Sequence, residues 1–164
     1  MNNKPFSFVT ATSTTLGKVF LASDGVHLTG LWFEGQKYFP PSILKTEHSS
    51  DLDIFKNTNQ WLEHYFAGKK PDFTPPLQPN GTAFRHKVWD ILLDIPYGEV
   101  ITYGDIAKKL NIHSAQAVGG AVGHNPISIL IPCHRVVGAS GDLTGFAGGL
   151  DKKIWLLKNE GVAL

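Results

Sequence analysis

The segment from Pro71 to Gly81 constrains the fold of this chain more than any other. It contains four prolines in eleven residues. Proline fixes φ and has no backbone N–H, so such a segment cannot lie in a helix interior or a central strand. We therefore predict a linker and two domains, over residues 1–76 and 77–164. A chain of 164 residues with 42% hydrophobic residues can give each domain a core of its own.

The first half has the pattern of a small α+β domain. Two β-prone runs, Lys18–Ala22 and Val26–Phe33, flank the turn signal Ser23–Gly25 and predict a hairpin. Apolar residues at helical spacing predict a helix over Asp53–Ala67, and Gly68 is a natural stop. No nucleophiles, bases or phosphate-binding glycines cluster here, so we interpret this half as scaffold.

The second half has the pattern of short helices. Apolar spacing predicts a helix over Phe84–Ile95, which Pro96–Gly98 ends. The sequence Thr102–Asp105 resembles a capping box and opens the next helix. A tight break at Asn111–His113 leads to a helix over about Ser114–His124. Two short helices joined by a tight turn predict a helix-turn-helix.

Two adjacent glycines, Gly119 and Gly120, lie inside the last of these helices. A glycine there costs about 1 kcal/mol relative to alanine, so the pair calls for a reason. One interpretation is close packing against a neighbouring helix. The other is close approach by a ligand backbone, such as a DNA strand. The spacing does not decide between them.

The chemistry of the chain is concentrated around its single cysteine, Cys133. An apolar, β-prone run over Ile127–Val137 contains it, and Gly138–Gly149, with five glycines in twelve residues, follows. We predict a strand that presents Cys133 as a nucleophile at the start of an adaptable loop. The competing interpretation is an inert, buried thiol.

His134 is the neighbour that favours a reactive cysteine. A histidine close to a thiol lowers its pKa and promotes the thiolate. Successive residues of a strand point to opposite faces, so contact with Cys133 would need a turn or a bridging water. Glu160, near the end of a predicted helix over Asp151–Asn159, is a candidate to orient the imidazole.

Several classes of protein are disfavoured. One cysteine allows no internal disulfide and no multi-cysteine zinc site, and the seven histidines lack His-x-x-x-His spacing, so we expect no metal. No apolar run is long enough to span a bilayer, and the N-terminus lacks a signal-peptide pattern, so we expect a cytoplasmic protein that does not enter a membrane. A net charge of +1 leaves the partner open.

The segment Pro132-Cys-His-Arg-Val136 resembles the active-site signature of the O6-alkylguanine-DNA alkyltransferases, also called methylated-DNA–protein-cysteine methyltransferases. The similarity extends over about Gly81–Gly161 through five further motifs in the family's order, which are Tyr97–Tyr103, Ala117–Ala121, Asn125-Pro126, Gly145–Gly149 and Trp155–Gly161. The front half resembles, more weakly, the α+β N-terminal domain of the family, which has a ribonuclease H-like core. The implied fold is therefore α+β, with a helix-turn-helix, winged-helix-like catalytic domain second.

The resemblance implies a single-use reaction without a cofactor. In this family a thiolate displaces the alkyl group from O6 of guanine in DNA, with O4-alkylthymine as a further candidate substrate, and keeps it as a thioether. Cys133 would be the acceptor, and His134 would take its proton through a water. Glu160 would orient His134, and Asn125 would brace the active-site loop.

The resemblance also implies how guanine is recognised. Tyr103 would donate a hydrogen bond to N3 of the base, which makes guanine a better leaving group. The carbonyls of Cys133 and Val136 would accept from the exocyclic amine, and the amide of Ala147 would meet O6. Phe146 stands where many members have tyrosine and would wall the pocket.

The expected partner is double-stranded DNA, bound by a monomer through the minor groove with the damaged base flipped out. Ala117 and Gly120, on the second helix of the helix-turn-helix, would permit the close approach. Gln116 stands where the family usually has an arginine that fills the gap left by the base. We therefore expect weaker flipping than in an arginine-bearing relative.

Two other functions stay open on the sequence alone. One is a non-catalytic, alkyltransferase-like lesion binder, although that group lacks the cysteine that this chain retains. The other is a cysteine hydrolase that uses Cys133, His134 and Glu160, although the helix-turn-helix would then have no purpose.

Overall fold

The computed structural model describes residues 7–49 and 51–164 of the chain. They fold as two compact units that divide between Asn80 and Gly81, slightly after the predicted boundary at 76/77. The fold is α+β, as predicted. The first unit contains β1 (Phe8–Thr14), β2 (Gly17–Ser23), β3 (Leu28–Phe33), the 3₁₀ helix η1 (Pro41–Lys45) and α1 (Asp53–Phe66).

Three antiparallel strands in the order β1-β2-β3 form the sheet of the first unit. The predicted hairpin is confirmed as β2 and β3. Its turn is held by Asp24, whose Oδ1 accepts from the backbone N–H of Val26 at 2.9 Å and of His27 at 2.7 Å. Strand β1 was not predicted, although its sequence has the β-branched residues typical of a strand.

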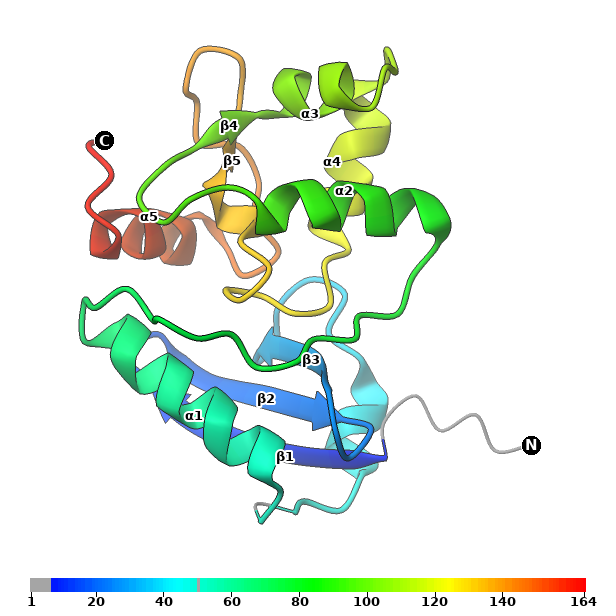
Figure 1. Ribbon diagram of the computed structural model, residues 1–164, viewed down its shortest axis with the longest axis vertical. Helices are drawn as coiled ribbons and strands as arrows, with labels where there is room; N and C mark the ends of the chain where they lie inside the picture. The colour runs from blue at the N-terminus through cyan, green and yellow to red at the C-terminus, as the bar shows by residue number, and fades with distance from the viewer. Residues whose placement is uncertain (1–6, 50) are drawn as a thin grey trace. The chain divides into compact units, whose positions relative to one another are not determined.

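Helix α1 packs against all three strands and covers one face of the sheet (Figure 1). Its buried residues include Phe55, Leu62 and Tyr65. Gly68, just after the end of the helix, has a positive φ of 79°. The helix predicted over Asp53–Ala67 is therefore confirmed. On the sheet, an apolar cluster of Val9, Phe20, Ala22, Trp32 and Ile43 forms part of the core.

The proline-rich segment is partly bound to the first unit. Leu28 N–H donates to the carbonyl of Pro76 at 2.8 Å, and Gln78 N–H donates to the carbonyl of Leu28 at 2.9 Å. Residues 76–78 thus pair with the start of β3, which explains why the first unit extends a few residues past the predicted boundary.

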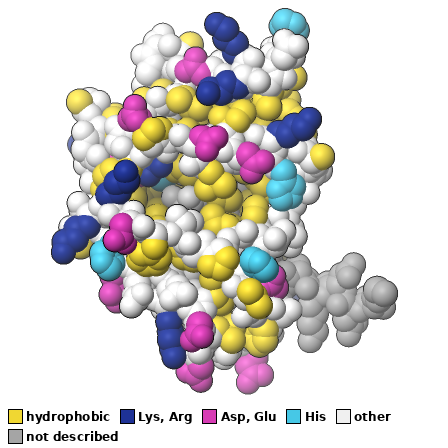
Figure 2. Space-filling model, in the orientation of Figure 1, with side chains coloured by type: hydrophobic (Ala, Val, Ile, Leu, Met, Phe, Trp, Pro, Cys, Tyr) yellow, Lys and Arg dark blue, Asp and Glu magenta, His cyan; other side chains and the backbone are white. Residues whose placement is uncertain are grey.

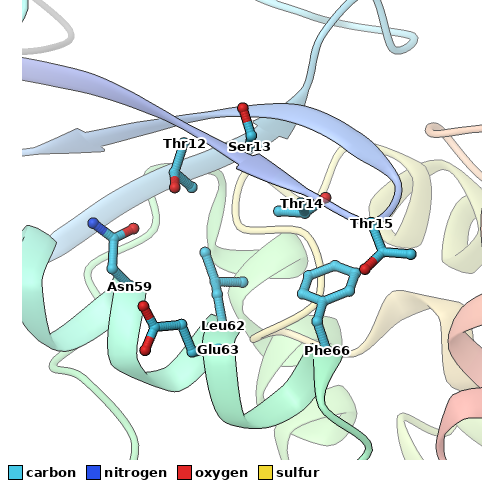
Figure 3. Close-up of a pocket in the computed structure, with 8 residues that line it drawn as sticks. All are labelled: Thr12, Ser13, Thr14, Thr15, Asn59, Leu62, Glu63 and Phe66. Atoms are coloured by element: carbon cyan, nitrogen blue, oxygen red, sulfur yellow. The ribbon is translucent and has the colours of Figure 1, made fainter.

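A polar cavity of about 360 Å³ lies between the end of β1 and α1 (Figure 3). Thr12 points from β1 toward the helix, Asn59 and Glu63 point back toward the strand, and Ser13 points away. Hydroxyls, one amide and one carboxylate supply the polar groups of its lining, which includes neither a cysteine nor a histidine. Its polar groups therefore differ from the cysteine and histidine of the second unit.

The second unit contains α2 (Ala83–Leu93), β4 (Ile101–Thr102), α3 (Tyr103–Lys109), α4 (Ala115–Gly123), the 3₁₀ helix η2 (Cys133–Arg135), β5 (Val136–Val137) and α5 (Leu150–Asn159). The capping box is confirmed: Thr102 Oγ1 accepts from Asp105 N–H, and Asp105 Oδ2 accepts from Thr102 N–H, both at 3.0 Å. The side chain of Ser114 caps α4. None of the helices in the described ranges is long and apolar enough to cross a membrane.

The strand predicted over Ile127–Val137 is wrong. Only Val136–Val137 is a strand, and it pairs in parallel with β4. Before it, the chain forms turns in which Leu130 N–H donates to Ser128 O at 2.9 Å and Ile129 has a positive φ of 72°. The run is apolar because it is buried, and burial alone does not distinguish a strand from an irregular core segment.

Candidate functional site

Cys133 begins the 3₁₀ turn η2 rather than ending a strand. The turn closes through Arg135 N–H, which donates to Pro132 O at 3.0 Å. Successive residues of a 3₁₀ helix are separated by about 120° instead of the 180° of a strand. The turn that a Cys133–His134 relay requires is therefore present. Cys133 is buried, with 6% of its surface exposed.

Asn125 holds the segment that leads to the cysteine. Its Nδ2 donates to Ile131 O at 2.8 Å, and its Oδ1 accepts from Ile127 N–H at 2.9 Å. Both side-chain groups are thus used across the irregular turns, and the residue is only 3% exposed. Asn125 thus ties together the backbone at Ile127 and Ile131, in the segment that leads to Cys133.

The structure brings His134 and Glu160 together. His134 is fully buried, and its Nε2 lies 2.6 Å from Oε2 of Glu160, at the C-terminal end of α5. An ionised carboxylate only accepts hydrogen bonds, so Nε2 carries the hydrogen of this pair. The lone pair of the neutral ring is then on Nδ1, which makes Nδ1 the basic nitrogen.

Glu160 is held by two further donors. Its Oε1 accepts from Arg135 Nε at 2.7 Å and from Gly98 N–H at 3.0 Å. Arg135 in turn donates from Nη1 to Ile95 O at 2.7 Å. A Cβ at Gly98, where φ is 81°, would lie 3.1 Å from the Glu160 carbonyl oxygen, so this turn requires glycine.

The pKa shifts of these groups indicate that Cys133 and His134 are both uncharged at rest, next to the ionised carboxylate of Glu160. Burial would raise the pKa of Glu160, but hydrogen bonds and charge from His134 and Arg135 outweigh it and hold the pKa at about 2. Burial lowers the pKa of His134, against the opposing effect of Glu160. Burial raises the pKa of the Cys133 thiol, and Asn125 and the charge of Lys153 act against it. The resting pair is therefore a thiol and a neutral imidazole that can accept its proton.

Lys153, on α5, is a fully buried residue that donates from Nζ to three carbonyls. The acceptors are Val136 O at 2.6 Å, Thr144 O at 2.7 Å and Gly145 O at 3.4 Å. Burial lowers its pKa to about 8, so the ammonium form prevails near neutral pH. This contact joins the end of the cysteine turn to the glycine-rich loop.

Most of the other residues predicted to recognise guanine belong to the two segments that Lys153 joins. Val136 is buried and follows η2 directly. Phe146 and Ala147 are half-buried in the loop, immediately after Gly145. Tyr103 is the first residue of α3, and its Cε1 would lie 4.0 Å from a Cβ built on Gly119 of α4.

The two adjacent glycines of α4, Gly119 and Gly120, are not required by packing within the protein. A Cβ at Gly120 would meet no atom within 4 Å, and one at Gly119 would only touch the Tyr103 ring edge. Gln116, Ala117 and Gly120 are all exposed. Of the two interpretations left open by the sequence, the geometry supports close approach by a ligand.

A shallow groove of about 370 Å³ lies at the turn between α3 and α4, lined by residues that include Lys108 and His113. Figure 2 shows Lys, Arg, Asp and Glu side chains interspersed over the face in view. The binding of a nucleic acid by this protein would therefore depend on shape as well as on charge.

The family model of the 6-O-methylguanine DNA methyltransferase DNA-binding domain matches residues 83–162, and that of its ribonuclease-like domain matches residues 8–79. The methylated-DNA–protein-cysteine methyltransferase of Haemophilus influenzae is 44% identical over 147 residues, 88% of this chain and 81% of the relative. The chain belongs to the methylated-DNA–protein-cysteine methyltransferase family.

Further relatives agree with that membership. The methyltransferase of Methanosarcina acetivorans is 45% identical over 150 residues, 89% of this chain and 93% of the relative. The crystal structure of Mycobacterium tuberculosis OGT in complex with DNA matches with a TM-score of 0.83 and 41% identity, over 93% of this chain and 92% of that one. As a methyltransferase of this family, the protein binds DNA and repairs it by transferring an alkyl group to one of its own cysteines. Cys133 is its only cysteine.

Two charged residues of the methyltransferase site were missed by the sequence analysis. Lys153 has a sequence signal, because it occupies the same helical stripe of α5 as Leu156, Leu157 and Glu160, at spacings of three, four and seven residues. A lysine on the buried stripe of a helix needs partners. Arg135 has no comparable signal, because its partners Ile95 and Glu160 are remote in sequence.

Proposed function

We propose that the protein is a single-use alkyltransferase that removes the alkyl group from O6 of guanine in double-stranded DNA and keeps it on Cys133. The observation that carries this proposal is the buried relay next to the only cysteine, in which Glu160 holds Nε2 of His134 at 2.6 Å. Family membership supplies the reaction, and the relay supplies a base beside the nucleophile.

The reaction begins with the loss of a proton from the Cys133 thiol. Nδ1 of the neutral His134 accepts it through a water, and the imidazolium is stabilised by the adjacent carboxylate of Glu160. Because burial raises the thiol pKa, the thiolate forms only when this base takes the proton. The resting cysteine is thereby protected from adventitious alkylation.

Transfer is then a single displacement. A bond forms between Cys133 Sγ and the alkyl carbon, the bond from that carbon to O6 breaks, and its electron pair moves into the purine. Tyr103 donates a hydrogen bond to N3 as this charge develops. The purine then takes up a proton from solvent to become guanine, and the imidazolium of His134 releases the thiol proton to solvent. The sum is alkylguanine and thiol converted into guanine and thioether, with no co-reactant.

The pocket is proposed to read guanine largely through backbone atoms. The carbonyls of Cys133 and Val136 accept from the exocyclic amine, the amide of Ala147 meets O6, and Phe146 forms a wall. Asn125 maintains the turn that aims Cys133, through its bonds to Ile127 and Ile131. Backbone recognition fits a glycine-rich loop, where side chains would obstruct the base.

The DNA is proposed to bind along α4 through its minor groove, with the damaged nucleotide flipped out. The open surface over Gly120 supports a close approach of the sugar-phosphate backbone, and the degenerate code of the minor groove suits a repair protein that acts in any sequence. Gln116 would enter the stack where the base has left. We propose that the protein acts as a monomer in the cytoplasm, where the DNA of a bacterial cell lies.

The proposal is tested by mixing limiting protein with a duplex that carries one O6-methylguanine and measuring how much guanine is restored. The expected amount equals the amount of protein and does not rise with time. A minor-groove ligand should compete with binding, whereas methylation of the major groove should not.

Repeated turnover would contradict the proposal and favour a hydrolase. Binding of the lesion without restoration of guanine would contradict it in favour of a non-catalytic binder. A duplex with O4-methylthymine, run in parallel, defines whether the pocket also accepts that base.

A further inference from the structure

The proposed reaction makes no use of Lys153, although it is a charged residue with no exposed surface. An isolated buried ammonium is strongly disfavoured, and it persists only where polar groups replace its water. Here three carbonyl oxygens take the three ammonium hydrogens, from Val136, Thr144 and Gly145. Its hydrogen-bond partners are thus backbone carbonyls, so Lys153 can fix where those carbonyls lie.

The three carbonyls belong to two separate segments. Val136 follows the cysteine turn, and its carbonyl is one of the proposed acceptors for guanine. Thr144 and Gly145 are exposed and directly precede the other side of the proposed pocket, Phe146 and Ala147. Lys153 therefore joins the two walls between which the base would bind.

The glycine-rich loop needs such a contact because its backbone hydrogen bonds are local. Gly138 N–H and Thr144 N–H both donate to Asp142 O, at 2.8 and 3.0 Å, and Gly149 N–H donates to Phe146 O at 2.9 Å. These bonds shape the loop but do not attach it to the cysteine turn. A loop with five glycines in twelve residues also loses much conformational entropy when it is ordered.

We propose that Lys153 is a positioning residue that clamps Thr144 and Gly145 to Val136 and so holds the guanine pocket at its working width. This inference rests on the proposed function of that pocket. The competing role is electrostatic, because Lys153 also favours the thiolate of Cys133 through its charge. The two roles predict different results for reagents that do and do not use the pocket.

The test compares the wild type with Lys153→Met, which keeps the length of the side chain but removes every donor. The rate of single-turnover transfer from an O6-methylguanine duplex depends on the geometry of the pocket. The rate at which iodoacetamide alkylates Cys133 depends only on the reactivity of the thiol. We expect the first rate to fall by about 10- to 100-fold, as small misplacements of reacting groups do. The iodoacetamide rate should fall by a much smaller factor, because that reagent reacts without being positioned by the pocket.

Hydrogen exchange provides a readout that is independent of transfer. In Lys153→Met the peptide that covers residues 138–149 should exchange faster than in the wild type, while that of α4 should be unchanged. This result is expected even if the wild type transfers no alkyl group, in which case the proposed function fails and the clamp stands. Lys153→Gln, which keeps one donor group, should give intermediate values and serves if the methionine variant does not fold.

The clamp is refuted if the loop exchanges at the wild-type rate in both variants. It is also refuted if the transfer and iodoacetamide rates fall by the same factor, because Lys153 would then act through its charge on the thiol.

Discussion

Replacing Gly120 with alanine should stabilise the protein and weaken its binding to DNA. Gly120 lies within α4, a Cβ there would meet no atom within 4 Å, and its φ is not in the positive range. The added methyl group therefore encounters no clash inside the protein. Relief of the helix cost of glycine should raise the free energy of unfolding by about 0.4–1 kcal/mol. For a chain of this size that corresponds to a rise of roughly 1–4 °C in Tm.

On the proposed mode of binding, the same methyl group would stand where the DNA backbone approaches. Forcing an extra methyl group into a closely packed contact costs about 1–3 kcal/mol. The Kd for a duplex containing O6-methylguanine should therefore rise by about 5- to 150-fold. The comparison is made by fluorescence anisotropy in a Cys133→Ala background, so that alkyl transfer does not consume the complex, and by urea unfolding of the same proteins.

Asn57→Ala is a suitable control because Asn57 is exposed on α1 in the first unit. It should also stabilise a helix, by about 0.5 kcal/mol, and leave DNA affinity unchanged. A Gly120→Ala protein that is stabilised but binds DNA with wild-type affinity would refute the argument that this open surface faces DNA.

Three further predictions concern the pair of His134 and Glu160 and the residue Gln116 of α4. A carboxyl whose pKa falls from 4.5 to about 2 on folding contributes on the order of 3 kcal/mol, present above pH 4.5 and lost as the pH falls toward 2. Glu160→Gln should therefore flatten the pH dependence of urea unfolding in that range, and an unchanged slope would contradict the shift. His134→Gln should slow alkyl transfer by about 10²- to 10⁴-fold, as loss of a general base does, without changing DNA affinity. A wild-type rate of transfer in stopped-flow assays would exclude His134 as the base. Gln116→Arg should tighten binding and speed transfer by about 3- to 10-fold, since a charged donor adds on the order of 1 kcal/mol, and the idea fails if neither quantity changes.

Local signals made much of the second unit predictable. The capping box of Thr102 and Asp105 involves residues three apart, and both of its hydrogen bonds are present. The turn at Asn111 and the caps of α4 follow from the same short-range chemistry. The pairing of His134 with Glu160 is different, because those residues are 26 apart in sequence. The sequence offered Glu160 as a candidate, but spacing did not establish the contact, and the resemblance to a family was needed to predict it.

The irregular segment before Cys133 was not predictable from its composition. Apolar, β-branched residues over Ile127–Ile131 favour a strand locally, but Asn125 and Pro132 override that preference by engaging the backbone and removing a donor. Lys153 contacts main-chain carbonyls, which every residue has, so the sequence does not reveal which residues accept its hydrogen bonds. Such tertiary contacts determine the active-site geometry, and they emerge only once the chain has folded.

Intact-mass spectrometry is the most direct test of the central claim. The protein is mixed with an excess of a duplex that carries one O6-methylguanine, and the product is digested to locate the change. The expected result is the mass of one methyl group on Cys133, saturating at about one per chain because the thioether is not turned over. No gain in mass at Cys133, with the duplex bound or repaired, would contradict the account.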